Sequence, residues 1–132
     1  MTDQTMILFV DDDEEDHFIM LQYFKEVGKD QHVKFIRNGQ EAIDFLEGIS
    51  DDSVLPRLIV LDLNMPILNG TQTLLQMKRT KRLSRIPVII LSTSENENER
   101  RKCLSFGAEE YLVKPSTYQE GLHLIEKFTA YL

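Results

Sequence analysis

The sequence predicts an α/β fold in which a parallel sheet is covered by helices on both faces. Five short apolar runs recur along the 132 residues, and none alternates with polar residues as a strand with one wet face would. Helical patterns separate the runs, as the crossover connections between parallel strands require. Hydrophobic residues make up 42% and charged residues 28%, which is typical of a globular domain. We therefore expect one domain over residues 1–132.

The first apolar run covers residues 7–10 and ends in Asp11, Asp12 and Asp13. From about Glu14 the apolar positions follow the period of a helix, and Gly28 is a typical C-terminal stop. One face of this helix collects His17, Met20, Leu21, Phe24 and Val27. The first unit is therefore a strand, an acidic loop and a helix, in which Asp13 and Glu14 are expected to cap the helix.

The second unit begins with a strand at 32–36 and a turn at 38–39, and its helix ends near Gly48. The buried stripe of that helix is Ala42, Ile43 and Leu46. A polar loop over 48–57 leads to the third apolar run, 58–61, which ends in Asp62 and is followed by the chain breakers Pro66, Asn69 and Gly70. The next helix is expected to contain Leu74, Leu75, Met77 and Lys78. The basic residues at 78–82 and 85 are interpreted as its cationic end rather than a docking patch.

The fourth apolar run, 88–91, ends in a hydroxyl-rich segment that starts with Ser92. Ser94 and Glu97 have the spacing of a capping box, which predicts a helix from there to about Phe106, where Gly107 stops it. The helical pattern after Ser92 therefore separates the fourth run from the fifth.

The fifth run, 111–113, ends at Lys114 and Pro115. Ser116 and Gln119 have the spacing of another capping box, so a final helix is expected to follow. Its predicted buried face is Tyr118, Leu122, Ile125 and either Phe128 or Thr129.

Polar side chains gather at the predicted strand ends, which all lie at one edge of a parallel sheet: Asp11, Asp12, Asp62, Ser92 and Lys114. Carboxylates ~4 Å apart repel by roughly 4 kcal/mol at an effective dielectric constant of about 20, so they favour a bound cation. Oxygen ligands without His or Cys suit Mg²⁺ or Mn²⁺. Three acids, a hydroxyl and an ammonium can receive a phosphoryl group, with the Asp62 carboxylate as nucleophile.

Composition and motif content argue against several other classes of protein. A net charge of −7 argues against a nucleic-acid surface. The sequence contains no glycine-rich phosphate loop, so nucleotide binding is not supported. No apolar run approaches the ~20 residues that cross a bilayer, and residues 1–5 lack the basic segment of a secretory signal, so a cytoplasmic protein is expected. The single cysteine, Cys103, allows no internal disulfide and is expected to be a buried hydrophobe. His17, His32 and His123 show no metal-ligand spacing.

Two alternatives to a signalling protein use similar residues. A Mg²⁺-dependent phosphatase or phosphotransferase with an aspartate nucleophile usually has a second acid two residues later, and Asn64 occupies that position. A flavodoxin-like cofactor binder would need a phosphate-cradling loop after the first strand, where three aspartates would repel the phosphate. Both alternatives are therefore disfavoured.

The chain resembles the receiver domains of bacterial two-component response regulators along nearly its whole length. The spacing agrees, because 30 residues separate Asp62 from Ser92 and 52 separate it from Lys114. The matching motifs are Val10 with Asp11 and Asp12, Asp62 with Met65, Pro66 and Gly70, Ser92, and residues 111–115.

The resemblance implies a flavodoxin-like (βα)₅ fold with strand order 2-1-3-4-5 and no output domain. It implies that Asp62 accepts a phosphoryl group from a sensor histidine kinase. Asp12, Asp62 and the backbone carbonyl of Asn64 would hold Mg²⁺, and Asp11 would act through water. Ser92 and Lys114 would bind the phosphoryl oxygens. In the family the residues matching Ser92 and Tyr111 are switch residues that remodel the face of the fourth helix, fifth strand and fifth helix. The bond between Lys114 and Pro115 is commonly cis there.

Two features depart from the usual pattern of the family. Thr93 stands where many members have Ala or Gly, which would slow the entry of a phosphodonor or water, and the loop over 48–57 is long. Both are similar to stand-alone receivers associated with phytochromes, so a phytochrome-type kinase and a downstream protein or phosphotransfer partner are the expected partners. The face of the fourth helix, fifth strand and fifth helix could serve for docking or for a homodimer, with Phe106, Tyr111, Phe128 and Tyr131 as its apolar residues.

Overall fold

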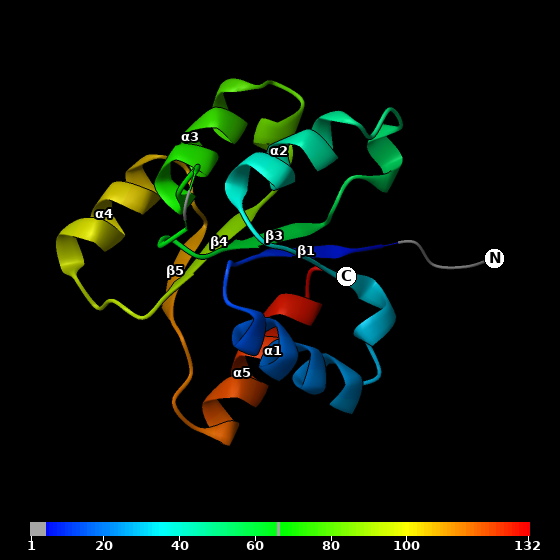
Figure 1. The fold of residues 1–132 in the computed structure, drawn as a ribbon, viewed down its shortest axis with the longest axis vertical. Helices are drawn as coiled ribbons and strands as arrows, with labels where there is room; N and C mark the ends of the chain where they lie inside the picture. The colour runs from blue at the N-terminus through cyan, green and yellow to red at the C-terminus, as the bar shows by residue number, and fades with distance from the viewer. Residues whose placement is uncertain (1–4, 66) are drawn as a thin grey trace.

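The computed structural model describes residues 5–65 and 67–132, which form one sheet with helices on both faces (Figure 1). Its strands are β1 (Ile7–Val10), β2 (Val33–Ile36), β3 (Leu58–Leu61), β4 (Val88–Ser92) and β5 (Glu110–Val113). All neighbouring pairs are parallel, in the order β2-β1-β3-β4-β5. The predicted fold class and strand order are confirmed. The predicted break at Pro66 and the expectation about residues 1–4 lie outside the described residues.

Helices on the two faces of the sheet bury two separate cores. The helices α1 (Glu14–Glu26) and α5 (Tyr118–Thr129) lie on one face, and α2 (Gly39–Glu47), α3 (Gly70–Arg79) and α4 (Glu97–Ser105) lie on the other (Figure 1). In β1, Ile7 and Phe9 join the first core, whereas Leu8 and Val10 join the second. Because β1, β3 and β4 are buried on both faces, their sequences show no alternation.

Several predicted boundaries move by one or two residues. β2 begins at Val33, because His32 belongs to a 3₁₀ turn over Asp30–His32. Asn38 is the N-cap of α2 and accepts a hydrogen bond from the backbone N–H of Glu41, so the predicted turn is a helix start. Asn69 caps α3 in a capping box with Gln72. These Asn residues mark the start of a helix rather than a break between elements.

The capping box predicted at Ser94 is wrong. Asn96 is the N-cap of α4, and its side chain accepts from the backbone N–H of Glu99 at 3.1 Å. Ser94 stays outside the helix because its carbonyl accepts from the Tyr111 hydroxyl at 2.9 Å. A tertiary contact that local spacing cannot reveal therefore selects the cap.

The capping box predicted at Ser116 and Gln119 is also displaced by one residue. Thr117 caps α5 and accepts from the backbone N–H of Glu120 at 3.1 Å. Glu120 in turn accepts hydrogen bonds from the backbone N–H and the hydroxyl of Ser116. The helix therefore starts at Tyr118, and Glu120 takes the place predicted for Gln119.

The buried faces of the first and last helices differ partly from the prediction. Met20 and Phe24 are buried, but Val27 lies beyond the last turn of α1 and is 41% exposed. Tyr118 is 49% exposed and stacks on Tyr23 of α1 with ring centroids 5.8 Å apart. α5 buries Gly121, Leu124, Ile125 and Phe128 instead of Leu122. The cause is the packing of α5 against α1, since a Cβ at Gly121 would collide with the Tyr23 ring.

The long loop over 48–57 is ordered by side-chain contacts. It contains a 3₁₀ turn over Asp52–Val54, and Arg82 donates to the Asp52 carboxylate and the Ile49 carbonyl. Arg82 is therefore an anchor for this loop, whereas Lys78 and Arg79 form the predicted cationic end of α3. Cys103 is fully buried, as predicted.

Two further expectations concern the peptide bonds and the membrane. The described residues contain no cis peptide bond, so the bond between Lys114 and Pro115 is trans, contrary to what the resemblance implies. For a bond to proline the two isomers differ by only about 0.5–1 kcal/mol, so local context decides between them. Within the described ranges, none of the helices has the length and apolar character that a membrane crossing needs.

Candidate functional site

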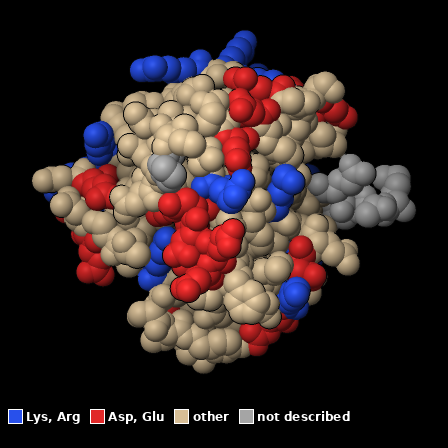
Figure 2. Space-filling model, in the orientation of Figure 1, with Lys and Arg blue, Asp and Glu red and all other residues tan. Residues whose placement is uncertain are grey.

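Backbone hydrogen bonds bring the predicted site residues to one edge of the sheet. The N–H of Asp11 donates to the carbonyl of Ile36 at 3.0 Å, which continues the pairing of β1 with β2. The N–H of Asp62 donates to Val10 at 2.9 Å, and that of Lys114 donates to Ser92 at 2.8 Å. These side chains therefore start from the carboxyl ends of neighbouring strands, as the sequence predicts. Figure 2 shows acidic side chains gathered over the start of α1, at this edge.

Lys114 links the acidic residues of this edge. Its Nζ lies 3.1 Å from Asp11 Oδ2 and 3.6 Å from Asp62 Oδ1. The Lys114 side chain is 17% exposed, so these contacts are shielded from water more than a surface ion pair is. The ammonium thus stands beside the carboxylate predicted to be the nucleophile.

Three carboxylates form a group that could hold a cation. One oxygen from each of Asp11, Asp12 and Asp62 lies within 4.8 Å of the others. Asp11 and Asp62 are buried, whereas Asp12 is exposed. Hard oxygen donors of this kind fit Mg²⁺ or Mn²⁺, which keep several water ligands, and an exposed side of the site leaves room for that water. The carbonyl of Asn64 remains a predicted ligand.

The pKa values of the acids reflect their burial and the repulsion between neighbouring carboxylates in the site. Burial raises the pKa of Asp11 to about 7; a backbone hydrogen bond from Asp13 opposes this shift, and Asp16 adds to it. Burial also raises the pKa of Asp62, although the charge of Lys114 opposes it. Burial by itself would lower the pKa of Lys114, but Asp16, Asp11 and Asp62 raise it above its usual range. A divalent cation would relieve the repulsion between the carboxylates.

Asp16 is a member of the site that the sequence reasoning missed. It lies in the first turn of α1, and its Oδ2 is 2.6 Å from Lys114 Nζ. Burial opposes the shift, but the hydrogen bond from Lys114 lowers the pKa of Asp16. An acid in the first turn of a helix is normally explained by the helix dipole, so the sequence held no distinct signal.

Ser92 and Tyr111 flank the segment between β4 and α4. Ser92 is fully buried, and its Oγ accepts from the backbone N–H of Ser94 at 3.1 Å. The Tyr111 hydroxyl donates to the Ser94 carbonyl at 2.9 Å and lies 3.3 Å from Glu99 Oε1. Both predicted switch residues therefore contact Ser94. Thr93, in the same segment, is exposed.

Gly70 allows α3 to start directly against the site. A Cβ at this position would lie 2.8 Å from the Cα of Leu63 and closer still to the carbonyl oxygen of Asp62. Any larger residue would push the helix away from the backbone of Asp62. The match of Gly70 to the receiver motif therefore has a steric cause.

His17 also contacts this edge, in a structural role. Its Nε2 lies 2.5 Å from the backbone carbonyl of Asp11, and its ring packs against Phe35 with centroids 5.0 Å apart. His32 contacts the Thr5 carbonyl through Nδ1 at 2.8 Å. Among the described residues, the group of carboxylates that could hold a cation includes neither histidine.

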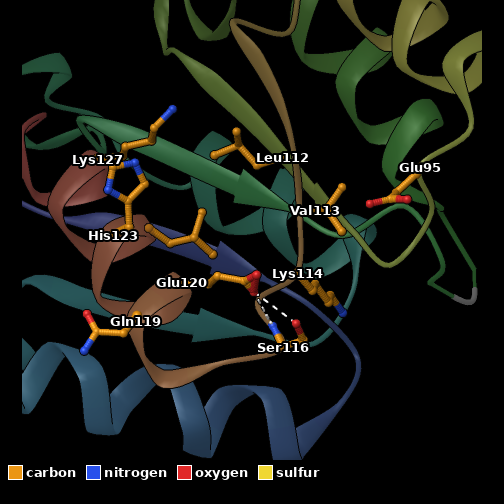
Figure 3. Close-up of a pocket in the computed structure, with 10 residues that line it drawn as sticks. Glu95, Leu112, Val113, Lys114, Ser116, Gln119, Glu120, His123 and Lys127 are labelled. Atoms are coloured by element: carbon orange, nitrogen blue, oxygen red, sulfur yellow. Dashed lines mark hydrogen bonds between the residues drawn. The ribbon is translucent and has the colours of Figure 1, made fainter.

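A groove of about 490 Å³ runs beside β5 and α5 (Figure 3). Lys114 lines it, whereas Asp11, Asp12 and Asp62 do not. Ser116 and Glu120 close one end with their hydrogen bonds (Figure 3). The groove lies on β5 and α5, within the face that the sequence suggests for docking. Two residues named for that face do not offer a free apolar side chain there, because Phe128 is fully buried and the Tyr131 hydroxyl donates to Glu109 at 2.6 Å. Phe128 packs against the sheet because it lies on the same face of α5 as the buried residues Gly121 and Leu124.

Comparisons with known proteins identify the family of the chain. A family model of the response regulator receiver domain matches residues 7–126. The probable methanogenesis regulatory protein FilR2 of Methanothrix harundinacea is 32% identical over 132 residues, which cover 98% of this chain and 84% of FilR2. The response regulator Rcp1 of Synechocystis sp. is 31% identical over 123 residues, which cover 92% of this chain and 84% of Rcp1.

Solved structures extend the similarity to three dimensions. The crystal structure of the Mn²⁺-bound form of Rcp1 matches with a TM-score of 0.80 and 28% identity, over 96% of this chain and 92% of that chain. The crystal structure of the phosphorylated cyanobacterial phytochrome response regulator RcpA matches with a TM-score of 0.82 and 27% identity, over 97% and 96%. The chain therefore belongs to the family of response regulator receiver domains of two-component signalling.

Proposed function

We propose that Asp62 is the phosphoacceptor of this receiver domain. A carboxylate oxygen of Asp62 attacks the phosphorus of a phosphohistidine on a sensor histidine kinase, an O–P bond forms, and the P–N bond to the departing imidazole breaks. The observation that carries this proposal is the meeting of Asp11, Asp62 and Lys114 at the carboxyl edge of the sheet. A nucleophilic carboxylate beside a cation and a further acid is an arrangement suited to phosphoryl transfer.

Mg²⁺ or Mn²⁺ is the proposed cofactor, held by Asp11, Asp12, Asp62 and the backbone carbonyl of Asn64. The close approach of three carboxylate oxygens supports this assignment, as does the similarity to the Mn²⁺-bound form of Rcp1. The bound cation would neutralise charge on the transferring phosphoryl oxygens. A bound cation would favour the charged form of Asp11 and would therefore oppose the rise of its pKa.

Ser92 and Lys114 are proposed to bind the phosphoryl oxygens, and Ser92 and Tyr111 to transmit the change. Lys114 offers a positive charge next to Asp62, and Ser92 a hydroxyl at the end of the neighbouring strand. Tyr111 reaches the start of α4 through Ser94 and Glu99. A movement of Ser92 toward the phosphoryl group would therefore alter the contacts of Tyr111 and the surface of α4, β5 and α5.

A phytochrome-type sensor histidine kinase is the proposed donor of the phosphoryl group. The phosphorylated domain is proposed to act on a downstream protein or a phosphotransfer partner. The similarity to RcpA, a phytochrome response regulator, supports the first assignment. We also propose that residues 1–132 act in the cytoplasm as a single receiver domain that changes protein contacts rather than as an enzyme on small molecules. Asn64 is exposed and is not an acid, which disfavours the phosphatase alternative.

Intact-mass measurement after incubation with acetyl phosphate tests the phosphoacceptor. The parent chain is expected to gain one phosphoryl group in the presence of Mg²⁺ and to lose this gain when EDTA removes the metal. The variant Asp62→Asn removes the nucleophile and should gain nothing, whereas Asp13→Asn keeps a helix cap outside the cluster and should behave as the parent does. Phosphorylation of Asp62→Asn at the parent rate would refute the assignment.

A further inference from the structure

The three carboxylates around Lys114 lie at unequal distances from its ammonium. Asp16 Oδ2 is nearest at 2.6 Å, Asp11 Oδ2 follows at 3.1 Å, and Asp62 Oδ1 is farthest at 3.6 Å. A hydrogen bond to a charged oxygen normally measures about 2.7–2.9 Å, so the contact with Asp62 is an ion pair without a direct hydrogen bond. Lys114 is therefore held most closely by the acid that sequence reasoning did not assign to the site.

Asp16 is placed on the helix side of Lys114 by the first turn of α1. Its side chain is 27% exposed and that of Lys114 is 17% exposed, so water screens this pair only in part. Asp16 lies outside the group of carboxylates that could share a metal, and the ammonium already occupies one of its oxygens. Its role is therefore directed at Lys114 rather than at the cation.

Space beside the ammonium allows it to exchange partners. A small cavity of about 60 Å³ borders Asp11, Asp16 and Lys114, with Ile19 and Pro115 on its apolar side. The long, flexible side chain of lysine can follow a stronger negative charge through a short movement. A phosphoryl group adds about 1.5 to 2 negative charges at neutral pH, and such a group on Asp62 would draw Lys114 toward it.

We propose that Asp16 is a positioning residue that keeps the Lys114 ammonium out of hydrogen-bonding distance of Asp62 in the unphosphorylated protein and competes with the phosphoryl group for it. The inference rests on the proposed function, in which Lys114 binds a phosphoryl oxygen. Phosphorylation then requires Lys114 to leave or weaken its contact with Asp16, and loss of the phosphoryl group restores that contact. Asp16 thereby lowers the affinity of the site for a phosphoryl group.

Titration with beryllofluoride, which mimics the phosphoryl group on an aspartate, tests this competition at saturating Mg²⁺. Fluorine NMR would measure the affinity of the parent chain, of Asp16→Asn and of Asp16→Ser, a second variant that removes the carboxylate. Both variants are expected to bind beryllofluoride about three- to tenfold more tightly, the range expected for a partly screened ion pair. Glu15→Gln removes an exposed charge from the same turn without touching Lys114, and should change the affinity less than about twofold.

A double substitution separates action through Lys114 from a general effect of charge. In a Lys114→Gln background the gain from Asp16→Asn should disappear. A gain that persists there, an equal gain in Glu15→Gln, or unchanged or weaker binding in both Asp16 variants would overturn the inference while leaving the proposed function intact. Failure of the parent chain itself to bind beryllofluoride with Mg²⁺ would contradict the proposed function and the inference together.

Discussion

Lys78 and Lys114 are both partly buried lysines, one near the amino edge of the sheet and the other at its carboxyl edge. Lys78 Nζ donates to the backbone carbonyls of Ser84 and Ile86, at 3.1 and 3.2 Å. Burial lowers the pKa of Lys78, and the charge of Glu109 opposes this shift. Lys114 instead stands among three carboxylates that raise its pKa. Lys78 therefore fastens neutral backbone groups, whereas Lys114 belongs to a charge network whose members can exchange partners.

Removal of Lys114 is expected to produce the largest effect. Lys114→Met should lower the rate of phosphorylation by acetyl phosphate about 100-fold, because a charged donor beside the transferring group is lost. Intact-mass time courses with saturating Mg²⁺ would measure the rate, and Lys78→Met is the matched control at the other edge. Equal rates in the two variants would contradict the distinction between the two lysines.

The acids around Lys114 should make the stability of the metal-free protein depend on pH. Folded Asp11 keeps its proton up to a pH of about 7, whereas an unfolded aspartate loses it near pH 3.9. Between these values the folded state binds more protons, so the free energy of unfolding should fall as pH rises, by about 4 kcal/mol. The raised pKa of Asp62 acts in the same direction.

Urea denaturation in EDTA, from about pH 4.5 to about pH 7.5, would measure this slope across the range in which the two states differ in bound protons. Asp11→Asn should flatten most of it, because the amide does not titrate. Saturating Mg²⁺ should raise stability most at the higher pH, where the carboxylates are free of protons. A flat profile for the metal-free parent chain would show that burial of Asp11 is compensated by other groups.

Removal of Lys78 should affect stability rather than chemistry. Lys78→Met leaves the carbonyls of Ser84 and Ile86 without their donor and should lower the free energy of unfolding by about 1–2 kcal/mol. Urea denaturation with Mg²⁺ present would measure the loss. The phosphorylation rate should stay within about twofold of the parent rate, since the hydrogen bonds of Lys78 go to Ser84 and Ile86 at the other edge of the sheet. A large loss of rate would mean that this edge is coupled to the site.

The two edges also differ in how much of them could be predicted from the sequence. The apolar runs and the acids at their ends predicted the sheet and most of the site, because strand ends in a parallel sheet must meet at one edge. The pairing of Asp16 with Lys114 could not be predicted, since 98 residues separate them and an acid in the first helical turn has an ordinary local explanation. The part played by Lys78 was hidden in the same way among the basic residues that end α3.

Predictions from local spacing were wrong where a contact with a distant residue determines the role of a side chain. Ser94 and Asn96 are both good N-caps, and the hydrogen bond from Tyr111 to the Ser94 carbonyl is a distant contact that favours Asn96. The position of Tyr118 suits the buried face of α5. However, Gly121 allows Tyr23 of α1 to approach α5, and the Tyr23 ring stacks on the Tyr118 ring at the surface. Such choices depend on tertiary packing, which sequence periodicity does not contain.

The smallest predicted effect tests this choice of cap at the carboxyl edge. Asn96→Ala should lower the free energy of unfolding by about 1 kcal/mol, because the backbone N–H of Glu99 loses its acceptor. Ser94→Ala removes only a hydroxyl that accepts from Asn96 outside the helix and keeps the carbonyl that binds Tyr111, so its cost should be less than about 0.5 kcal/mol. Urea denaturation of both variants with Mg²⁺ would compare them. A larger loss in Ser94→Ala would restore the capping box that the sequence predicts, and would place the start of α4 nearer to Ser92.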